Sequence, residues 1–279
     1  MIELEPLLKD DAVADRGGEG IPVLVDGASG HALRQAEHFD DEQDPEFEVE
    51  RPSGTTELYA WMLEEKFRRS VAGIEELLSG ATVLTVCGGS GMEAELLARR
   101  GARVVCSDIS LGAARRARER ARRHGVDLTP VVADAEDLPF ADASFDVVYV
   151  HDGLHHLQRP DAALAEMARV ARRAVSVTEP ADAAVTRAAV RAGLALSREP
   201  AGNPVIRFDL DALVQSLRLH GFEIVRAERY GLYYRHHPGS VSRFLSRRRL
   251  LPVAAGAIHA ANAVAGRIGN KLTVQAVRA

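Results

Sequence analysis

Short apolar runs and helical patterns alternate along the middle of the chain. The runs are rich in valine and leucine, and the segments between them repeat apolar residues at intervals of three and four. Because helices that connect successive strands carry the chain back across a sheet face, the strands pair in parallel. The pattern therefore predicts a doubly wound α/β sheet. Strands are expected over residues 82–86, 103–107, 128–133, 145–150 and 174–178.

The N-terminal segment departs from this rhythm. A dense acidic run follows Glu37, with few apolar residues to anchor it. Runs of like charge usually remain solvated. We therefore expect residues 1–54 to form a flexible or lid-like acidic arm, and residues 55–279 to form the main domain, which begins with a helical pattern.

The C-terminal third also differs. Asp209 is placed to cap a helix, and residues 222–225 and 271–277 are typical of strands. Residues 240–266 are rich in alanine and predict a helix. We expect this helical region, around residues 236–268, to form a cap on the domain, where it could also meet a second subunit in a homodimer.

Composition narrows the class of protein. The chain of 279 residues is 46% hydrophobic and carries 40 acidic against 35 basic side chains, for a net charge of -5. This balance argues against a nucleic-acid partner, so the arginine groups at residues 115–123 and 243–249 are interpreted as solvated helix faces. Two cysteines provide neither a disulfide framework nor a zinc-ligand spacing. Without a leader-like N-terminus or an uninterrupted apolar run of spanning length, we expect a cytoplasmic protein with no membrane partner.

A glycine turn and an acidic residue indicate a nucleotide-like ligand. The turn, Cys87-Gly-Gly-Ser-Gly91, lies between the first predicted strand and a helix, where glycine lets the backbone approach a ligand closely. Asp108 ends the next strand, where a carboxylate can accept hydrogen bonds from ribose hydroxyls. The same turn also satisfies the dinucleotide pattern, so an NAD-dependent oxidoreductase is an alternative at this point.

Further segments, in this order, carry a family resemblance. They are Asp134–Phe140, Ser144–Val148 and Val150–Leu157. With the turn and Asp108, they resemble the class I S-adenosylmethionine-dependent methyltransferases, in the small-molecule branch that includes quinone-biosynthesis enzymes. The resemblance covers roughly residues 77–179. It implies a Rossmann-like, mostly parallel seven-stranded sheet with an antiparallel last strand, and the transfer of a methyl group to an oxygen, nitrogen or carbon atom of a small metabolite.

The resemblance also implies roles for the matched positions. The turn would pack against the methionine part of the cofactor, Asp108 would hold the ribose, and Asp134 would accept a hydrogen bond from the adenine amine. A dehydrogenase has no comparable use for Asp134 and Ala135. The implied cofactor-binding residues are Cys87, Gly88, Gly89, Gly91, Asp108, Ile109, Asp134, Ala135, Val150 and His151.

Two positions depart from the family pattern. Thr85 stands where an acid is usual on the first strand, and Cys87 stands where a first glycine is usual. Threonine supplies no charge for the methionine ammonium, so we expect weakened or differently arranged cofactor binding. These departures leave open a second alternative, in which the chain binds the cofactor but catalyses a reaction other than methylation. Small-residue packing is the expected role of Cys87.

Histidines supply the catalytic candidates. His155 and His156 follow the fourth strand, at the sheet edge where open α/β folds bind ligands. In some relatives a histidine at the position of His156 works as a base, and packing on the sheet is the alternative. His151 and His155 have a metal-ligand spacing only if the segment is helical, which Gly153 opposes, so no metal is expected.

The acceptor site must come from outside the cofactor core. Tyr59 and Trp61 are two residues apart on one predicted helix and cannot both face one pocket. Trp61 fits the apolar stripe, so Tyr59 is the expected substrate contact. Aromatic walls with a few polar groups suit a small, partly apolar ligand. The candidate substrate-binding residues are Tyr59, Glu179, Tyr233, Tyr234 and His236.

Overall fold

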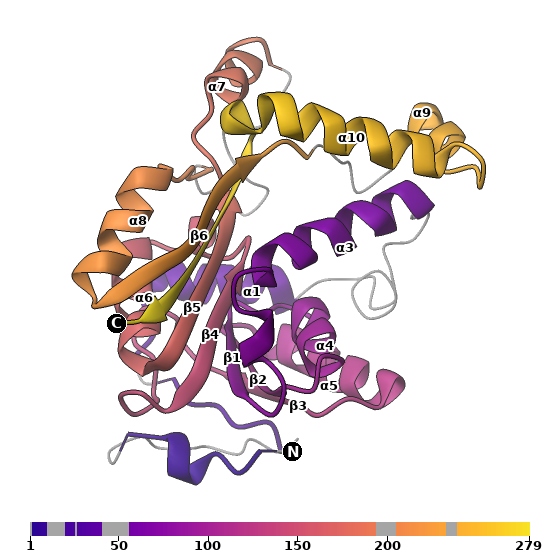
Figure 1. Ribbon diagram of the computed structural model, residues 1–279. Coiled ribbons are helices and arrows are strands. Elements are labelled where there is room, and N and C mark those ends of the chain that lie inside the picture. Colours follow the sequence, from indigo (N-terminus) through magenta and orange to yellow (C-terminus); the bar gives the residue numbers. More distant parts are fainter. Residues whose placement is uncertain (1, 10–19, 26, 41–55, 194–204, 233–238) are drawn as a thin grey trace.

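A seven-stranded sheet forms the centre of the molecule, with helices on both of its faces (Figure 1). The computed structural model describes residues 2–9, 20–25, 27–40, 56–193, 205–232 and 239–279. The strands are β1 (Thr82–Val86), β2 (Arg103–Asp108), β3 (Leu128–Val132), β4 (Phe145–His151), β5 (Ala171–Pro180), β6 (Phe222–Tyr230) and β7 (Lys271–Arg278).

The strand order is β3-β2-β1-β4-β5-β7-β6. Strands β1 to β5 pair in parallel, and β7 runs antiparallel to both of its neighbours, β5 and β6. The expected mostly parallel sheet with an antiparallel last strand is therefore confirmed. The order reverses at β1, which pairs with β2 on one side and β4 on the other. Ligands of open α/β sheets bind at the carboxyl ends of strands at such a reversal.

The helices form a layer on each face of the sheet. Helices α3, α4 and α5 pack with residues such as Val83 and Val104 on one face, and α6 and α8 pack with Leu84 and Val105 on the other. The described helices are α1 (Gly30–Asp40), α3 (Glu57–Val71), α4 (Met92–Ala98), α5 (Leu111–His124), α6 (Pro160–Val170), α7 (Ala184–Arg191), α8 (Leu210–Leu219), α9 (Ser240–Leu245) and α10 (Leu251–Ala265). Short 3-10 turns are η1 (Glu5–Leu7), η2 (Glu75–Leu77), η3 (Leu154–His156) and η4 (Gly266–Ile268).

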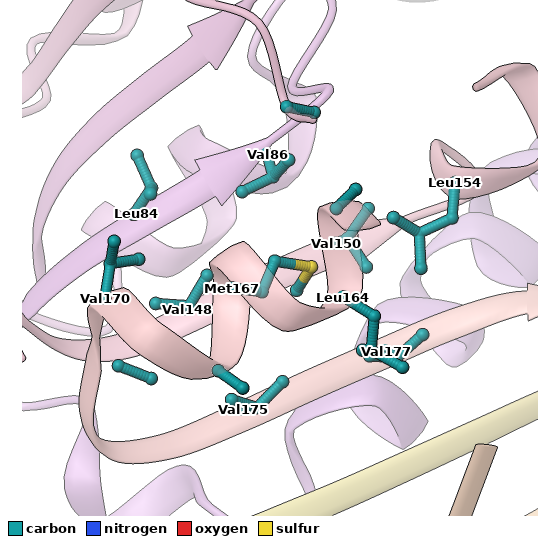
Figure 2. Packing of buried hydrophobic residues seen from close by; sticks show 14 of the residues in the cluster. Leu84, Val86, Val148, Val150, Leu154, Leu164, Met167, Val170, Val175 and Val177 are labelled. Atoms are coloured by element: carbon teal, nitrogen blue, oxygen red, sulfur yellow. The ribbon is translucent and has the colours of Figure 1, made fainter. Parts of the chain in front are cut away.

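The core between the sheet and α6 fixes the strand ends. Figure 2 shows Leu164 and Met167 of α6 against valines of β4 and β5, and all of these side chains are buried. Successive residues of a strand point to opposite faces, so both faces of each central strand are apolar. This packing holds the ends of β1 and β4 rigidly in place for the loops that follow them.

The predicted C-terminal helix over residues 240–266 is wrong in one respect. It divides into α9 and α10, separated by residues 246–250. Pro252 lies in the first turn of α10, where the helix does not need its missing N–H. A proline at this position also prevents α9 and α10 from forming one continuous helix. Helix α10 lies alongside α3 (Figure 1) and contacts it through an apolar cluster that includes Tyr59, Tyr230 and Ala254.

Parts of the N-terminal segment pack on the domain. The backbone of Leu24 donates to Val132 of β3 at 2.8 Å, and Val132 donates to Pro22 at 2.8 Å. Leu8 forms a bridge with Phe140. The stretches around Leu8 and Leu24 therefore lie against the edge strand β3 and the loop that follows it.

Candidate functional site

A cavity lies at the carboxyl ends of β1, β2, β3 and β4. Most of the predicted cofactor-binding positions meet there, and α1 closes one side of it. Its lining residues are His31, Ala32, Gln35, Phe39, Cys87, Gly89, Asp108, Ile109, Ala113, Arg116, Ala133, Asp134, Ala135, Glu136, Asp152, Gly153, His156 and Leu157.

The glycines of the turn between β1 and α4 have two different roles: some allow close packing, and another lines the cavity. A Cβ atom on Gly88 would lie 2.5 Å from Cys106 Sγ, and one on Gly91 would lie 3.2 Å from Ala117 Cβ. Both glycines therefore allow close packing and do not line the cavity. At Gly89, whose φ is +52°, no atom lies within 4 Å of the Cβ position. Gly89 is thus the glycine that leaves room for a ligand.

Cys87 occupies a backbone conformation that favours glycine. Its φ is +51°, in the left-handed region, which explains why the family resemblance expects glycine at this position. Its side chain fits only because Gly153 faces it, since a Cβ on Gly153 would lie 2.5 Å from Cys87 Cβ. Burial, followed by the negative charge of Asp108, raises the pKa of the Cys87 thiol well above its ordinary value. A thiol held protonated is a poor nucleophile, so the geometry favours packing.

Asp108 faces the cavity and supports the glycine turn. Its Oδ2 accepts a hydrogen bond from the Gly89 amide at 2.8 Å, and its Oδ1 accepts one from the Ser110 amide at 2.9 Å. Each carboxylate oxygen can accept a further hydrogen bond, so the side chain can still bind two hydroxyl groups. Burial raises the pKa of Asp108, although the two amides partly oppose this shift. The next residue, Ile109, also lines the cavity.

Asp134 and Ala135 form the neighbouring wall. The Oδ1 atom of Asp134 accepts from the Glu136 amide at 2.9 Å, which fixes the carboxylate at the end of β3. Burial raises its pKa. Asp108 and Asp134 thus stand on adjacent strands beside one cavity, as predicted from the sequence, and both have free acceptor capacity.

The loop after β4 is organised by a buried carboxylate. Glu179 is fully buried, and its Oε1 atom accepts from the Gly153 and Leu154 amides at 2.9 and 2.7 Å. Its Oε2 atom lies 2.7 Å from His155 Nδ1. Glu179 and His155 are therefore committed to holding this loop, and neither lines the cavity. Glu179 was expected to contact substrate, and the structure instead gives it a positioning role.

Of the two candidate catalytic histidines, His156 is the one that lines the cavity, together with His31 of α1. Its ring packs against Phe39 of α1 at 5.6 Å and against the His155 ring at 4.1 Å between centroids. The backbone oxygen of His156 lies 2.8 Å from His31 Nε2. Helix α1 and the η3 turn therefore position this imidazole from two sides.

Helix α1 is the part of the cavity that the sequence did not predict. Asp40 Oδ1 accepts from Ser110 Oγ at 2.6 Å and from the Gly112 amide at 2.7 Å, which anchors α1 to the N-terminus of α5. Arg116 donates to the Phe39 carbonyl oxygen at 2.8 Å. A local signal was present at the start of α1, where Ser29 Oγ caps the Ala32 amide at 3.1 Å.

A buried ion triad was also missed. Asp152 lines the cavity at a φ of +52°, Lys66 of α3 donates to it, and Lys271 of β7 donates to both of its oxygens at 2.8 and 2.9 Å. Although burial alone would raise it, the pKa of Asp152 is held well below its ordinary value by Lys271 and Lys66. The three residues come from distant segments, so sequence spacing gives no signal for them.

Several predicted residues lie elsewhere. Tyr59 is 3% exposed in the cluster between α3 and α10, whereas Trp61 is half-buried against the same cluster, so the prediction that Trp61 is the core residue and Tyr59 the substrate contact is wrong, and neither lines the cavity. The Val150 side chain is buried in the core, and His151 pairs with the Tyr149 hydroxyl at 2.9 Å, so neither lines the cavity. Tyr233, Tyr234 and His236 lie outside the described residues. Among the described residues, no group of three or more His, Cys, Asp or Glu side chains is arranged to hold a metal.

Comparison with known proteins identifies the central part of the chain. Residues 84–176 match the family model described as a methyltransferase domain. A demethylmenaquinone methyltransferase of Thermobifida fusca is 41% identical over 112 residues, which cover 39% of this chain and 47% of the relative. A ubiquinone/menaquinone biosynthesis C-methyltransferase of Paraburkholderia phymatum is 40% identical over 98 residues, covering 34% and 40%. The chain thus spans about half the length of the curated relatives it matches.

Solved structures share the fold. A magnesium protoporphyrin IX methyltransferase from Synechocystis, solved with bound S-adenosylmethionine, gives a TM-score of 0.56 at 16% identity, covering 91% of this chain and 100% of that chain. The cyclase SpnF gives a TM-score of 0.53 at 22% identity, covering 79% and 81%. Together with the sequence matches, these confirm the expected resemblance to class I methyltransferases of the quinone-biosynthesis type.

Proposed function

We propose that this chain, a class I methyltransferase by its central domain, binds S-adenosylmethionine and transfers its methyl group to an oxygen, nitrogen or carbon atom of a small metabolite. The observation that carries the proposal is the convergence of Gly89, Asp108 and Asp134 on one cavity beside the strand-order reversal. In this reading the enzyme acts in the cytoplasm on a small-molecule acceptor, without nucleic acid, and α1 serves as a lid over the cavity.

The residues present fit the cofactor. Asp108 would hold the ribose hydroxyls, because its two oxygens retain acceptor capacity after binding the Gly89 and Ser110 amides. Asp134 and the Ala135 backbone would hold the adenine. Thr85 is buried beneath the turn, outside the cavity lining, and supplies no charge. Asp152, beside Cys87 and Gly153, is already paired with Lys66 and Lys271, so it does not replace the charge that Thr85 lacks.

The bound cofactor would supply an electrophilic methyl group, whose transfer requires an acceptor atom held close and in line. His156 is the side chain we assign to the acceptor. Phe39 and His155 restrict its ring, so it can orient an acceptor and take its proton where that acceptor must ionise. Glu179 and His155 hold the loop that carries it.

Calorimetry with S-adenosylmethionine and with its demethylated product tests cofactor binding. We expect both to bind with one site per chain. Absence of binding to either would overturn the proposal, and tight NAD binding in its place would support the oxidoreductase alternative.

A second measurement separates methyl transfer from other chemistry on the same fold. The purified chain is incubated with the cofactor and demethylmenaquinone, the acceptor class in the names of the relatives, and the products are measured by mass spectrometry. We expect equal amounts of methylated product and demethylated cofactor. An acceptor that is altered while the cofactor remains intact would support the non-methylating alternative.

A further inference from the structure

The C-terminal helices expose an apolar surface. We call it the outer face and define it by Val241 and Phe244 of α9, Val253 and Val264 of α10, and Ile268 of η4. Val253 is 67% exposed and Val264 is 89% exposed. The exposed side of a helix in a water-soluble protein normally carries charged residues. Helix α10 contains no Asp, Glu, Lys or Arg, and its polar side chains are those of His259, which is exposed beside Glu65, and Asn262.

The protein itself covers only the opposite side of α10. Ala254 is the buried residue of this helix, and Leu251 and Ile258 pack partly against the cluster on α3. The outer face points away from these contacts, and in Figure 1 α10 lies at the periphery of the molecule beyond α3. An exposed apolar face of this kind indicates a surface that binds a partner.

Charge around the outer face indicates what kind of partner. No aspartate or glutamate follows Glu228, and the chain from there to the C-terminus contains nine arginine and lysine residues, although the whole chain has a net charge of -5. Within the described part of the chain, the arginines that flank the outer face form no ion pair. They are Arg243, Arg247, Arg248, Arg249 and Arg267, and all are exposed.

We propose that the outer face binds the surface of a lipid bilayer that contains anionic phospholipids. The apolar side chains would enter the headgroup boundary, and the flanking arginines would pair with lipid phosphates. Helix α10 would lie in the plane of the interface. No helix within the described residues is long and apolar enough to cross a bilayer. This proposal revises the expectation that the chain has no membrane partner, and it does not depend on methyl transfer.

A second copy of the chain fits this surface less well. Two α10 helices paired across a twofold axis would run antiparallel or parallel. In an antiparallel pair Arg247–Arg249 of one copy would approach Arg267 of the other, and in a parallel pair each arginine group would approach its own counterpart. Like charges brought together in this way oppose association. Anionic headgroups are complementary to the same arginines.

Vesicle co-sedimentation tests the proposal with the full chain. Vesicles of phosphatidylcholine alone are compared with vesicles containing about one third phosphatidylglycerol, at low and high salt. We expect binding only to the anionic vesicles, and we expect high salt to weaken it, because the attraction between arginine and headgroup is screened. We expect Val264→Glu, and separately Arg248→Glu with Arg249→Glu, to reduce partitioning by roughly tenfold or more.

Matched variants distinguish this surface from general effects of charge. Leu219→Glu changes a side chain on α8 that is 88% exposed, close to the 89% of Val264, and Arg115→Glu with Arg118→Glu reverses two exposed charges on α5. We expect both controls to bind anionic vesicles like the parent chain. The proposal is overturned if the parent chain does not bind anionic vesicles, or if the controls lose as much binding as the test variants. It is also overturned if sedimentation shows a dimer that Val264→Glu dissociates.

Discussion

Asp108 is the residue on which the cofactor assignment depends most directly. We predict that Asp108→Asn weakens binding of S-adenosylmethionine and its demethylated product by about 1.5–3 kcal/mol, because a charge-assisted pair of hydrogen bonds becomes neutral. Asparagine has one acceptor oxygen where aspartate has two, so either the Gly89 or the Ser110 amide loses its partner and the melting temperature should fall. Calorimetry gives the affinity. Asp142→Asn, on the surface, is the control, and an unchanged Kd for Asp108→Asn would contradict the ribose assignment.

The two neighbouring histidines should respond differently to replacement. His156 lines the cavity, so we predict that His156→Ala lowers kcat at least tenfold while the Kd of the cofactor changes less than twofold. Steady-state kinetics and calorimetry on the same protein provide the comparison. Unchanged turnover would leave His156 with a packing role only.

His155 should instead matter for stability. His155→Ala removes the side-chain partner of Glu179, which is fully buried, and we predict a loss of about 1–3 kcal/mol in the free energy of unfolding. Urea denaturation measures this loss, and His156→Ala is the matched control one residue away. Equal stabilities of the two variants would contradict the positioning role of the His155–Glu179 pair.

At the scale of the elements, helix α1 is held over the cavity by the carboxylate of Asp40. Asp40 binds Ser110 and the Gly112 amide at the positive end of α5. We predict that Asp40→Ala weakens cofactor binding roughly fivefold, equivalent to about 1 kcal/mol, with faster dissociation, because α1 closes the cavity less tightly. Stopped-flow binding measures the rates. Glu37→Ala, exposed on the same helix, should leave them unchanged.

The strands could be predicted because their signal is local. A valine-rich run that is buried on both faces can be recognised as a strand from the sequence alone, and β1 has the predicted bounds, Thr82–Val86. The glycine turn and its two aspartates were found for a related reason, since each lies at or close to the carboxyl end of a strand. Helix α1 had a local signal in Ser29, but its position over the cavity depends on the contact between Asp40 and Ser110, which lie 70 positions apart.

Burial within a helix was harder to predict than the helix itself. Tyr59 and Trp61 both fit the pattern of α3, and only the packing of α10 and Tyr230 decides that Tyr59 is the more buried. The Lys66–Asp152–Lys271 triad could not be predicted for the same reason, because its three residues come from segments that are remote in sequence. Contacts of this kind are properties of the tertiary structure.

For the molecule as a whole, His151 makes stability depend on pH. Burial, with the positive charge of Lys66, holds the pKa of His151 well below its ordinary value, so the folded chain keeps this imidazole neutral. Below about pH 6.5 the unfolded chain binds a proton there that the folded chain does not. Stability should fall with pH in this range, by up to about 1.4 kcal/mol per pH unit from this residue.

Urea denaturation at pH 7.5 and 5.5 measures this dependence. In His151→Gln, the decrease in the free energy of unfolding that comes from the imidazole should be absent. His220→Gln, at the exposed end of α8, should show the same pH dependence as the parent chain. A parent chain and a His151→Gln variant with identical pH profiles would contradict the assignment.

The separation of charge along the chain has a practical consequence for handling the protein. Residues 1–228 hold all 40 acidic side chains and 26 of the 35 basic ones, a net charge of -14, while the remainder is uniformly cationic. The described arginines at residues 243–249 and 267 therefore form a cationic region on a chain of net negative charge. A column of immobilised sulfonate groups should retain it near neutral pH through Arg243, Arg247–Arg249 and Arg267, even though its isoelectric point of about 6.1 would lead one to choose an anion exchanger.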